Sequence, residues 1–437
     1  MNRLFLVLYA MLFCGLISCT GAEKSNTIAI AVEKSDSCMS DAKSTYEVYI
    51  PARKNAVDKL PLLVILDAHG SGKFALAKFK SGANQYPVVL IASNVIKNGF
   101  NGYEGVIQTL INDVRQKYPV NETVFMTGFS GGARMALFYG LAHPLNGLIM
   151  CGALANPDQL NALRCPVISI SGMDDFNFME TAQYLFQEKS TPVNLKIELT
   201  HTSHSWPDSI LLANSLGFLT FTGEAGNTDI RNEARFKNYC LTQQARINSL
   251  KQQGDYLSAT LVAKNMAGTQ PFNNGVFTSA YQVLKNNPGY LNQLNLLEKC
   301  MNFEINARQT YIDAFRTKDT LWWKNEITTT DLKIKAEHDS FTKDMYRRIK
   351  GFWGIACYTF CKQAVMERNA ETLNKILSIY RKVEPENPDM LYFSSFPSYW
   401  TGKNDLTISL LKTALQAGFT DMNQLKKDFP EFDSSKF

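Results

Sequence analysis

Histidine is scarce in this chain, and several common signatures of function are missing from it. Only 5 of the 437 residues are histidine, so few side chains can act as a general base near neutral pH. The formal net charge of +5 is spread along the sequence, which gives no reason to expect a nucleic-acid partner. Beyond the N-terminal segment, no apolar run is long enough to cross a membrane.

Signatures of metal and nucleotide binding are also lacking. No Asp, Glu and His residues stand at the spacing of metal ligands. The string Gly70-Ser71-Gly72-Lys73 lacks the spacing of a phosphate-binding loop. Besides Cys14 and Cys19 there are seven cysteines, which match neither a zinc pattern nor a small disulfide scaffold. We therefore expect no cofactor and no metal ion, and we expect most cysteines to be buried as small hydrophobic side chains.

The N-terminus has the pattern of a targeting segment. Arg3 precedes an apolar run over residues 4–13, which is too short for a membrane span. The run leads to Leu16-Ile17-Ser18-Cys19, which resembles the lipobox of bacterial lipoproteins. The resemblance implies that residues 1–18 are a signal peptide, that Cys19 is lipidated, and that the protein is anchored in the cell envelope, either periplasmic or at the outer membrane. The alternative is an ordinary secretory signal with an incidental cysteine.

Residues 19–222 alternate short apolar runs with helical patterns. This alternation predicts a mostly parallel sheet with helices on both faces, the first two strands forming an antiparallel hairpin at one edge. The expected strands are residues 27–32, 45–50, 62–66, 88–92, 123–127, 147–151, 167–171 and 195–199. The expected helices are residues 105–117, 132–142, 179–188 and 207–216.

The rest of the chain has a different character. Residues 224–228 are a polar linker candidate, and residues 230–437 contain helical patterns with almost no strand-like run. Turns at Asn369 and Lys403 stand 34 positions apart, which is the period of tetratricopeptide repeats, and residues 385–388 and 410–419 resemble parts of that repeat. We expect a second domain that is tetratricopeptide-like; an unrelated helical bundle is the alternative.

The most informative string is Gly128-Phe129-Ser130-Gly131-Gly132. It directly follows an expected strand and directly precedes an expected helix, which is the setting of a serine nucleophile on a tight, strained turn. The Gly131 N–H at the helix start can then stabilise an oxyanion. The competing interpretation is a glycine-rich strand–helix connection without chemistry.

A serine nucleophile needs a base, and the histidines narrow the choice. His338 is remote in sequence, His143 stands at the end of the helix after the serine, and His69 precedes the serine. His201 and His204 both follow the last expected strand, as the chain order serine, acid, histidine requires. Either of these two fits the position of the base.

Residues 45 to about 220 resemble the α/β-hydrolase superfamily, and within it the secreted esterases related to feruloyl esterases and polyhydroxybutyrate depolymerases. The string Ser203-His204-Ser205-Trp206-Pro207 resembles the His-x-Trp-Pro of that group, which implies that His204 is the base. The group usually has Gly where this chain has Ser203. Trp206 is either a wall of the substrate pocket or part of the packing.

Two further strings resemble motifs of the same superfamily. Gly172-Met173-Asp174-Asp175 resembles its Gly-x-x-Asp, which implies that Asp175 is the acid, with Asp174 or Asp158 as alternatives. His69-Gly70-Ser71-Gly72 resembles its His-Gly loop, which implies an oxyanion donor at the Ser71 N–H, or next at Gly70, besides Gly131.

The expected function is that of a serine hydrolase cleaving a carboxylic ester through an acyl-enzyme. The ester would be a small molecule or linked to a polysaccharide, and the helical domain could bind a protein partner. Alternatives are a serine peptidase of the prolyl-oligopeptidase type and a non-catalytic binding protein that uses the helical repeats.

Overall fold

A computed structural model describes residues 30–54, 57–186, 192, 194–223, 233–273 and 275–431. The signal segment, the expected lipidation site Cys19 and the linker candidate 224–228 lie outside the described residues. None of the helices in the described ranges combines the length and the apolar character that a membrane crossing requires.

The first half of the chain forms one eight-stranded sheet with the order β1-β2-β4-β3-β5-β6-β7-β8. Strands β3 to β8 are parallel, whereas β1 pairs antiparallel with β2 and β2 pairs antiparallel with β4. This is the α/β-hydrolase fold. The strands are β1 (Val32–Cys38), β2 (Asp41–Ile50), β3 (Leu60–Leu66), β4 (Val89–Ser93), β5 (Val120–Phe129), β6 (Gly147–Cys151), β7 (Val167–Gly172) and β8 (Leu195–Thr200).

Helices cover both faces of the sheet, because the central strands carry apolar side chains on both of their faces. On β3, Leu62, Val64 and Leu66 face the layer that contains α2 and α3. Leu63 and Ile65 face the layer that contains α1 and α6. The helices of this half are α1 (Gly72–Gln85), α2 (Tyr103–Lys117), α3 (Gly131–Ala142), α4 (Pro157–Ala162), α5 (Met179–Phe186) and α6 (Ser209–Gly223).

The sequence-based expectation was wrong at the first strand and incomplete for the helices. The strand expected over residues 27–32 begins at Val32 instead, and its largely polar stretch runs along the exposed edge of the sheet, where no second layer requires apolar side chains. The antiparallel hairpin at the edge is confirmed. Helices α1 and α4 were not predicted; α1 opens directly from the loop at residues 69–72, which was interpreted only as a motif.

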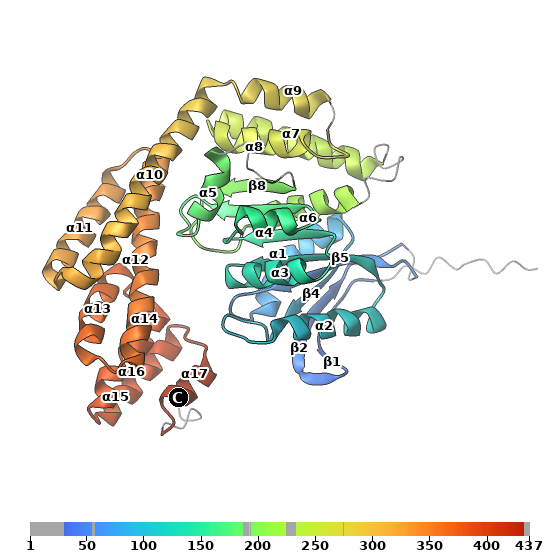
Figure 1. The fold of residues 1–437 in the computed structure, drawn as a ribbon. Helices are drawn as coiled ribbons and strands as arrows, with labels where there is room; N and C mark the ends of the chain where they lie inside the picture. The colour runs from blue at the N-terminus through green and yellow to red at the C-terminus, as the bar shows by residue number, and fades with distance from the viewer. Residues whose placement is uncertain are drawn as a thin grey trace, which may run out of the picture.

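The second half of the described chain is helical. Figure 1 shows α7 to α9 beyond the β8 edge and α10 to α17 as a layer along one side of the sheet. The helices are α7 (Ala234–Gln252), α8 (Tyr256–Ala267), α9 (Gly275–Leu284), α10 (Pro288–Thr317), α11 (Thr320–Ala336), α12 (Ser340–Met366), α13 (Ala370–Val383), α14 (Pro388–Phe393), α15 (Phe396–Trp400), α16 (Asn404–Gln416) and α17 (Met422–Asp428).

Local sequence explains where these helices begin. Asp and Asn side chains accept hydrogen bonds from the first-turn amides of seven of them, at Asp255, Asn287, Asp319, Asp339, Asn369, Asn387 and Asp421. The turns expected at Asn369 and Lys403 are the N-caps of α13 and α16. Helices α10 and α12, with 30 and 27 residues, are longer than the repeat pattern suggested.

Cysteine and tryptophan side chains of the described chain serve mainly as core. All seven described cysteines are buried, as expected for most of them, and all seven are free thiols. In the helical half, Trp323 and Trp353 are fully buried, and Trp322 and Trp400 pack partly buried against the same core. These four rings are therefore packing residues rather than an open platform for sugars.

Candidate active site

Ser130 stands at a sharp turn between β5 and α3. Its φ of 54° is in the region that side-chain-bearing residues rarely adopt, and its N–H donates to the Cys151 carbonyl at 2.8 Å. A Cβ at Gly128 would overlap the backbone of Gly132, and a Cβ at Gly132 would overlap the Leu66 carbonyl. The glycines are thus required by close backbone approach, and the strained turn expected from the sequence is present.

Three side chains far apart in the sequence meet at this turn. The His204 Nε2 lies 2.9 Å from the Ser130 Oγ, and the His204 Nδ1 lies 2.8 Å from the Asp175 Oδ2. The Asp175 side chain is 2% exposed, whereas that of His204 is 21% exposed. With a proton on Nδ1 donated to the carboxylate, Nε2 is free to accept the serine hydroxyl proton. The arrangement forms a continuous path from hydroxyl to imidazole to carboxylate.

The loop after β7 fixes both the carboxylate and the imidazole. The Asn177 N–H donates to the Asp175 Oδ1 at 2.8 Å, so that each carboxylate oxygen has a partner. The rings of Phe176 and Phe129 lie 4.3 and 4.6 Å from the His204 ring, centre to centre. These contacts leave the imidazole little freedom to rotate away from Ser130.

The alternative acids lie elsewhere. Asp174 faces the helical half, where its Oδ2 is 3.8 Å from Arg347 Nη1. Burial raises the pKa of Asp174 to about 6, and the nearby Asp344 carboxylate adds to this shift. Asp158 lies in the first turn of α4. Of the three candidates, only Asp175 has a hydrogen bond to His204 in the described structure.

The other candidate base, His201, also faces the helical half. Its Nε2 lies 3.4 Å from Asp255 of α8, and its Nδ1 lies 3.9 Å from Asp344 of α12. Hydrogen bonds with Asp255 and then Asp344 raise the pKa of His201 to about 9. The imidazole is therefore protonated at neutral pH and joins two helices.

The remaining histidines do not contact Ser130 in the described structure. His143 ends α3, stacks on Tyr139 and lies 2.8 Å from Glu104. His338 lies exposed between α11 and α12, and the His69 side chain is 72% exposed. His204 is thus the described histidine that reaches the serine.

The loop at residues 67–72 differs from the expectation for the oxyanion donors. The Ser71 N–H donates to the Asp67 Oδ1 at 3.1 Å, and the Gly70 N–H donates to the Asp67 carbonyl at 3.1 Å. The His69 N–H donates to the same Asp67 Oδ1 at 2.9 Å. Because Asp67 already accepts these amides, Ser71 does not present a free donor here, contrary to the expectation.

One feature beside the serine was not found from the sequence, and one open choice, that for Trp206, can now be weighed. The Asn98 side chain lies so close to Gly131 that a Cβ there would overlap its Oδ1, with Nδ2 farther away. Asn98 stands in an exposed loop without a recognisable motif, so no sequence signal marked it. Trp206 is buried, and its Nε1 donates to the Asp67 Oδ2 at 2.8 Å, which favours the packing interpretation over a pocket wall.

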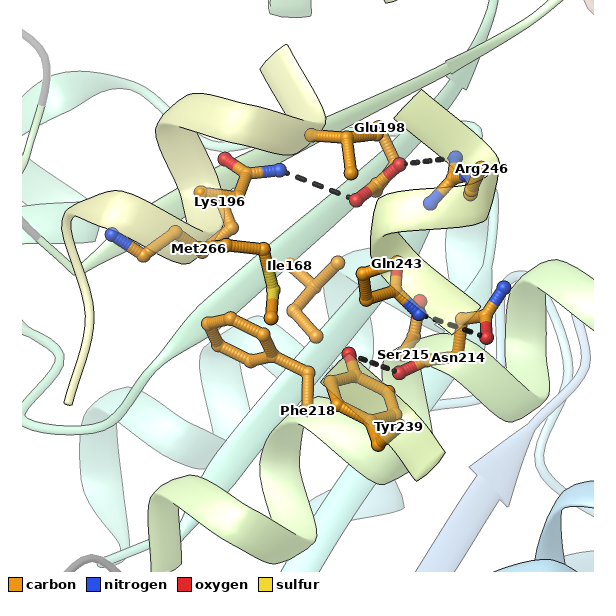
Figure 2. Close-up of a pocket in the computed structure, with 12 residues that line it drawn as sticks. Ile168, Lys196, Glu198, Asn214, Ser215, Phe218, Tyr239, Gln243, Arg246 and Met266 are labelled. Atoms are coloured by element: carbon orange, nitrogen blue, oxygen red, sulfur yellow. Dashed lines mark hydrogen bonds and ion pairs between the residues drawn. The ribbon is translucent and has the colours of Figure 1, made fainter. Parts of the chain in front are cut away.

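Two hollows of very different size show where a ligand has room. An open depression of about 510 Å³ lies along the Gly70–Gly72 loop and the first turn of α1, and includes Phe74 and Ala77. A closed pocket between β8, α6, α7 and α8 measures only about 10 Å³ (Figure 2). It is crossed by a Glu198–Arg246 ion pair of 2.6 Å and has room for about one water molecule. Of these two hollows, the depression along residues 70–72 is the one with room for a substrate group.

Within the described ranges, no three His, Cys, Asp or Glu side chains gather where they could hold a metal ion.

A scan against protein-family models finds no match, and a search of curated proteins finds no relative. Solved structures with partial similarity include an S-formylglutathione hydrolase from Agrobacterium tumefaciens, at 13% identity over 44% of this chain and 93% of that chain, with a TM-score of 0.33.

Two more solved structures have comparable similarity. Est1E from Butyrivibrio proteoclasticus is 13% identical over 45% of this chain and 100% of that chain, with a TM-score of 0.35. Esterase B from Lactobacillus rhamnosis, solved with a phosphonate inhibitor, is 14% identical over 46% of this chain and 89% of that chain, with a TM-score of 0.36. The fold assignment rests on the strand order of the chain itself.

Proposed function

We propose that this protein is a serine hydrolase that cleaves a carboxylic ester, with Ser130 as nucleophile, His204 as base and Asp175 as acid. The observation that carries the proposal is the pair of contacts of His204, 2.9 Å to the serine and 2.8 Å to the carboxylate. These lengths are within the range required for proton transfer. The positive φ of Ser130 adds support, because such strain persists where the surrounding structure over-determines it.

The proposed reaction has two steps. The Ser130 Oγ forms a bond to the ester carbonyl carbon while its proton passes to the His204 Nε2, and the carbonyl π electrons move to the oxygen. When the tetrahedral intermediate collapses, the bond to the alcohol breaks and His204 gives the alcohol its proton. Water then attacks the acyl-enzyme by the same path, His204 taking its proton, and releases the acid. Asp175 stays ionised and stabilises the imidazolium.

The negative charge that develops on the carbonyl oxygen needs hydrogen-bond donors to stabilise it. The Gly131 N–H at the start of α3 is one, because the helix N-terminus offers unsatisfied amides and a favourable dipole. The Asn98 side chain is our candidate for the second donor in place of the engaged Ser71 N–H; its Oδ1 is the atom nearest Gly131, so the Nδ2 amide must turn toward the substrate oxygen to donate. A side-chain amide serves this purpose as well as a backbone amide.

The substrate class is proposed from the site's shape and from the sequence resemblance to esterases. The depression beside residues 70–72 offers apolar surface from Phe74 and Ala77, which suits an aromatic or short acyl group of a small or polysaccharide-linked ester. Relative rates on aryl acetates, methyl ferulate and dipeptide anilides test the class, with Ser130→Ala as control. Faster cleavage of the anilides would favour the peptidase alternative, and no cleavage of any substrate would favour the binding-protein alternative.

We also propose that the protein is a lipoprotein of a bacterial cell envelope, anchored through Cys19. Support comes from the lipobox resemblance of residues 16–19, which lie outside the described residues. A palmitate analogue fed to expressing cells should label the wild type and the Cys14→Ala control, but not Cys19→Ala. Equal labelling of Cys19→Ala would refute the anchor.

For the helical half we propose tetratricopeptide-like packing around α13 and α16 and a role in shaping the site or binding a protein partner. The domain limits we propose are 19–222 and 230–437. Support for a repeat is that α13 and α16 begin 34 positions apart, each as the second helix of a pair. Lys97, in the loop after β4, lies 3.5 Å from Asp421 before α17, so this half also approaches the rim of the site.

A further inference from the structure

The loop that carries Asp175 is held by two arginines from the helical half. Two backbone carbonyls of this loop are held: that of Met173, two residues before Asp175, and that of Phe176, one residue after it. The Arg348 Nη1 of α12 donates to the Met173 carbonyl. The Arg308 Nη2 of α10 donates to the Phe176 carbonyl at 2.7 Å. Asp175 therefore lies between two anchored peptide groups.

One carboxylate joins the two arginines into a single cluster. The Glu304 Oε1 accepts from Arg308 Nη2 at 2.6 Å, and the Glu304 Oε2 accepts from Arg348 Nε at 2.8 Å. Arg348 and Glu304 have side chains that are 0% exposed, and Arg308 is mostly buried. Charges buried this deeply persist when each is paired and hydrogen-bonded, as these are.

The side chains packed around this cluster also belong to the Asp175 loop or touch it. Arg348 lies with its guanidinium 5.0 Å from the centre of the Phe178 ring, at the end of the same loop. Gly351, one turn along α12, lies beside the Phe176 side chain, the ring that packs against His204. The cluster thus touches the loop on both sides of Asp175 and reaches the ring that confines the imidazole.

We propose that Arg348, with Glu304 and Arg308, is a positioning residue for Asp175, so that the helical half is part of the catalytic machinery. A guanidinium is suited to this because its planar fork serves Glu304 and the Met173 carbonyl at once, an arrangement that a lysine ammonium reproduces only in part. The proposal rests on the proposed esterase function for its kinetic effect. Its structural effect, the anchoring of residues 173–178, stands independently of any activity.

The two possible roles of the cluster, stabilising the fold and positioning Asp175, lead to different expected kinetics of its variants. If the cluster only stabilises the fold, variants that remain folded keep the wild-type turnover of each active site. If it positions Asp175, folded variants lose kcat with little change in KM, because the proposed substrate depression along residues 70–72 includes no residue of the Asp175 loop. Loss of a supporting shell of this kind costs about 10- to 100-fold.

The experiment uses the full chain with Arg348→Met, Arg348→Lys and Arg308→Met. Arg308 is partly exposed, so Arg308→Met is the variant expected to fold even if Arg348→Met does not. Lys350→Met is the matched control: it removes a 2.6 Å ion pair with Asp331 from the same helix without touching the loop. Hydrogen–deuterium exchange of the peptide covering residues 172–180 is measured first. Then kcat and KM are measured on an aryl acetate, with the concentration of active sites determined by titration with a phosphonate inhibitor.

We expect faster exchange at 172–180 in Arg348→Met and Arg308→Met, unchanged exchange in Lys350→Met, and partial recovery in Arg348→Lys. We expect kcat to fall about 10- to 100-fold in Arg348→Met, with KM within about twofold of wild type. Wild-type exchange and kcat in folded Arg308→Met would overturn the proposal. If wild type neither binds phosphonate nor cleaves esters, the proposed function fails, while the exchange data still decide whether the cluster anchors the loop.

Discussion

The indole Nε1 of Trp206 donates to the carboxylate of Asp67 at 2.8 Å, and this bond links the loop after β8 to the loop after β3. Trp206 follows His204, the proposed base, by two residues, and Asp67 begins the loop that contains Gly70 and Ser71. The Phe129 and Phe79 rings pack against the indole at 5.6 and 6.0 Å. A buried pair therefore helps to set the distance between the loop that carries His204 and the loop at residues 67–72.

Replacing Asp67 with asparagine should disturb both loops. Asp67 accepts from the His69 and Ser71 amides through Oδ1 and from Trp206 through Oδ2, whereas an amide keeps only one acceptor oxygen. We expect Asp67→Asn to lose about 1–3 kcal/mol in the free energy of unfolding, measured in urea, since a buried donor is left unpaired. Trp206→Phe removes the donor and leaves the buried Asp67 Oδ2 without this partner, so it should also lower the stability. Equal stability of Asp67→Asn and wild type would contradict this account.

Asp174 and Asp175 are adjacent but should behave oppositely. Asp175→Asn should lower kcat by about 10⁴-fold, because the amide favours the wrong imidazole tautomer. Asp174→Asn should keep kcat. Since the pKa of Asp174 in the folded protein, about 6, exceeds its ordinary value, ionisation of this group destabilises the fold above pH 6.

Asp174→Asn should therefore melt at a higher temperature than wild type at neutral pH and at the same temperature near about pH 4. Calorimetry at the two pH values, together with steady-state rates, checks both statements. A large loss of kcat in Asp174→Asn would contradict the assignment of Asp175 as the acid.

His201 gives the protein a pH-dependent contact between the sheet half and helices α8 and α12. Its pKa is raised to about 9 in the folded state, so its contribution to stability is complete below its ordinary pKa and is lost as pH rises through 9. His201→Gln should lower the free energy of unfolding at pH 6 by no more than about 1 kcal/mol, because the imidazole is half exposed. At about pH 10 the variant and wild type should be equal. An equal deficit at both pH values would indicate packing rather than charge.

Asn98 tests the assignment of the second oxyanion donor. Asn98→Ala should lower kcat by about 10²-fold with little change in KM, because the donor acts mainly on the charged intermediate. Asn121→Ala is a control near the opposite end of β5 from Ser130: its side chain accepts a hydrogen bond from the Thr123 N–H at 2.9 Å. Should Asn98→Ala turn over like wild type, a backbone amide of residues 70–72 would have to rotate from Asp67 to serve instead.

Much of the sheet half could be predicted because its signals are local. The strand, turn and helix around Ser130 are contiguous, and buried parallel strands are nearly all apolar, so Gly147–Cys151 was predicted to the residue. The meeting of Ser130, Asp175 and His204 was also expected, since loops after parallel strands share one edge of the sheet.

What could not be predicted depends on contacts between distant segments. Whether the Ser71 N–H is free depends on how the Asp67 side chain turns, which the sequence pattern does not specify. Arg348 stands in an ordinary amphipathic helix, and only the packing of α12 against the β7 loop shows that it meets Met173. The helical half contributes to the site through such contacts, and none of them leaves a motif.

The central claim is that Ser130 is an activated nucleophile. The most direct measurement is labelling with a fluorophosphonate, followed by mass spectrometry of the peptide that contains residue 130. The account predicts one adduct per chain on Ser130 in wild type, much slower labelling in His204→Ala, and none in Ser130→Ala. An unlabelled wild type, or equal labelling of Ser130→Ala, would contradict it.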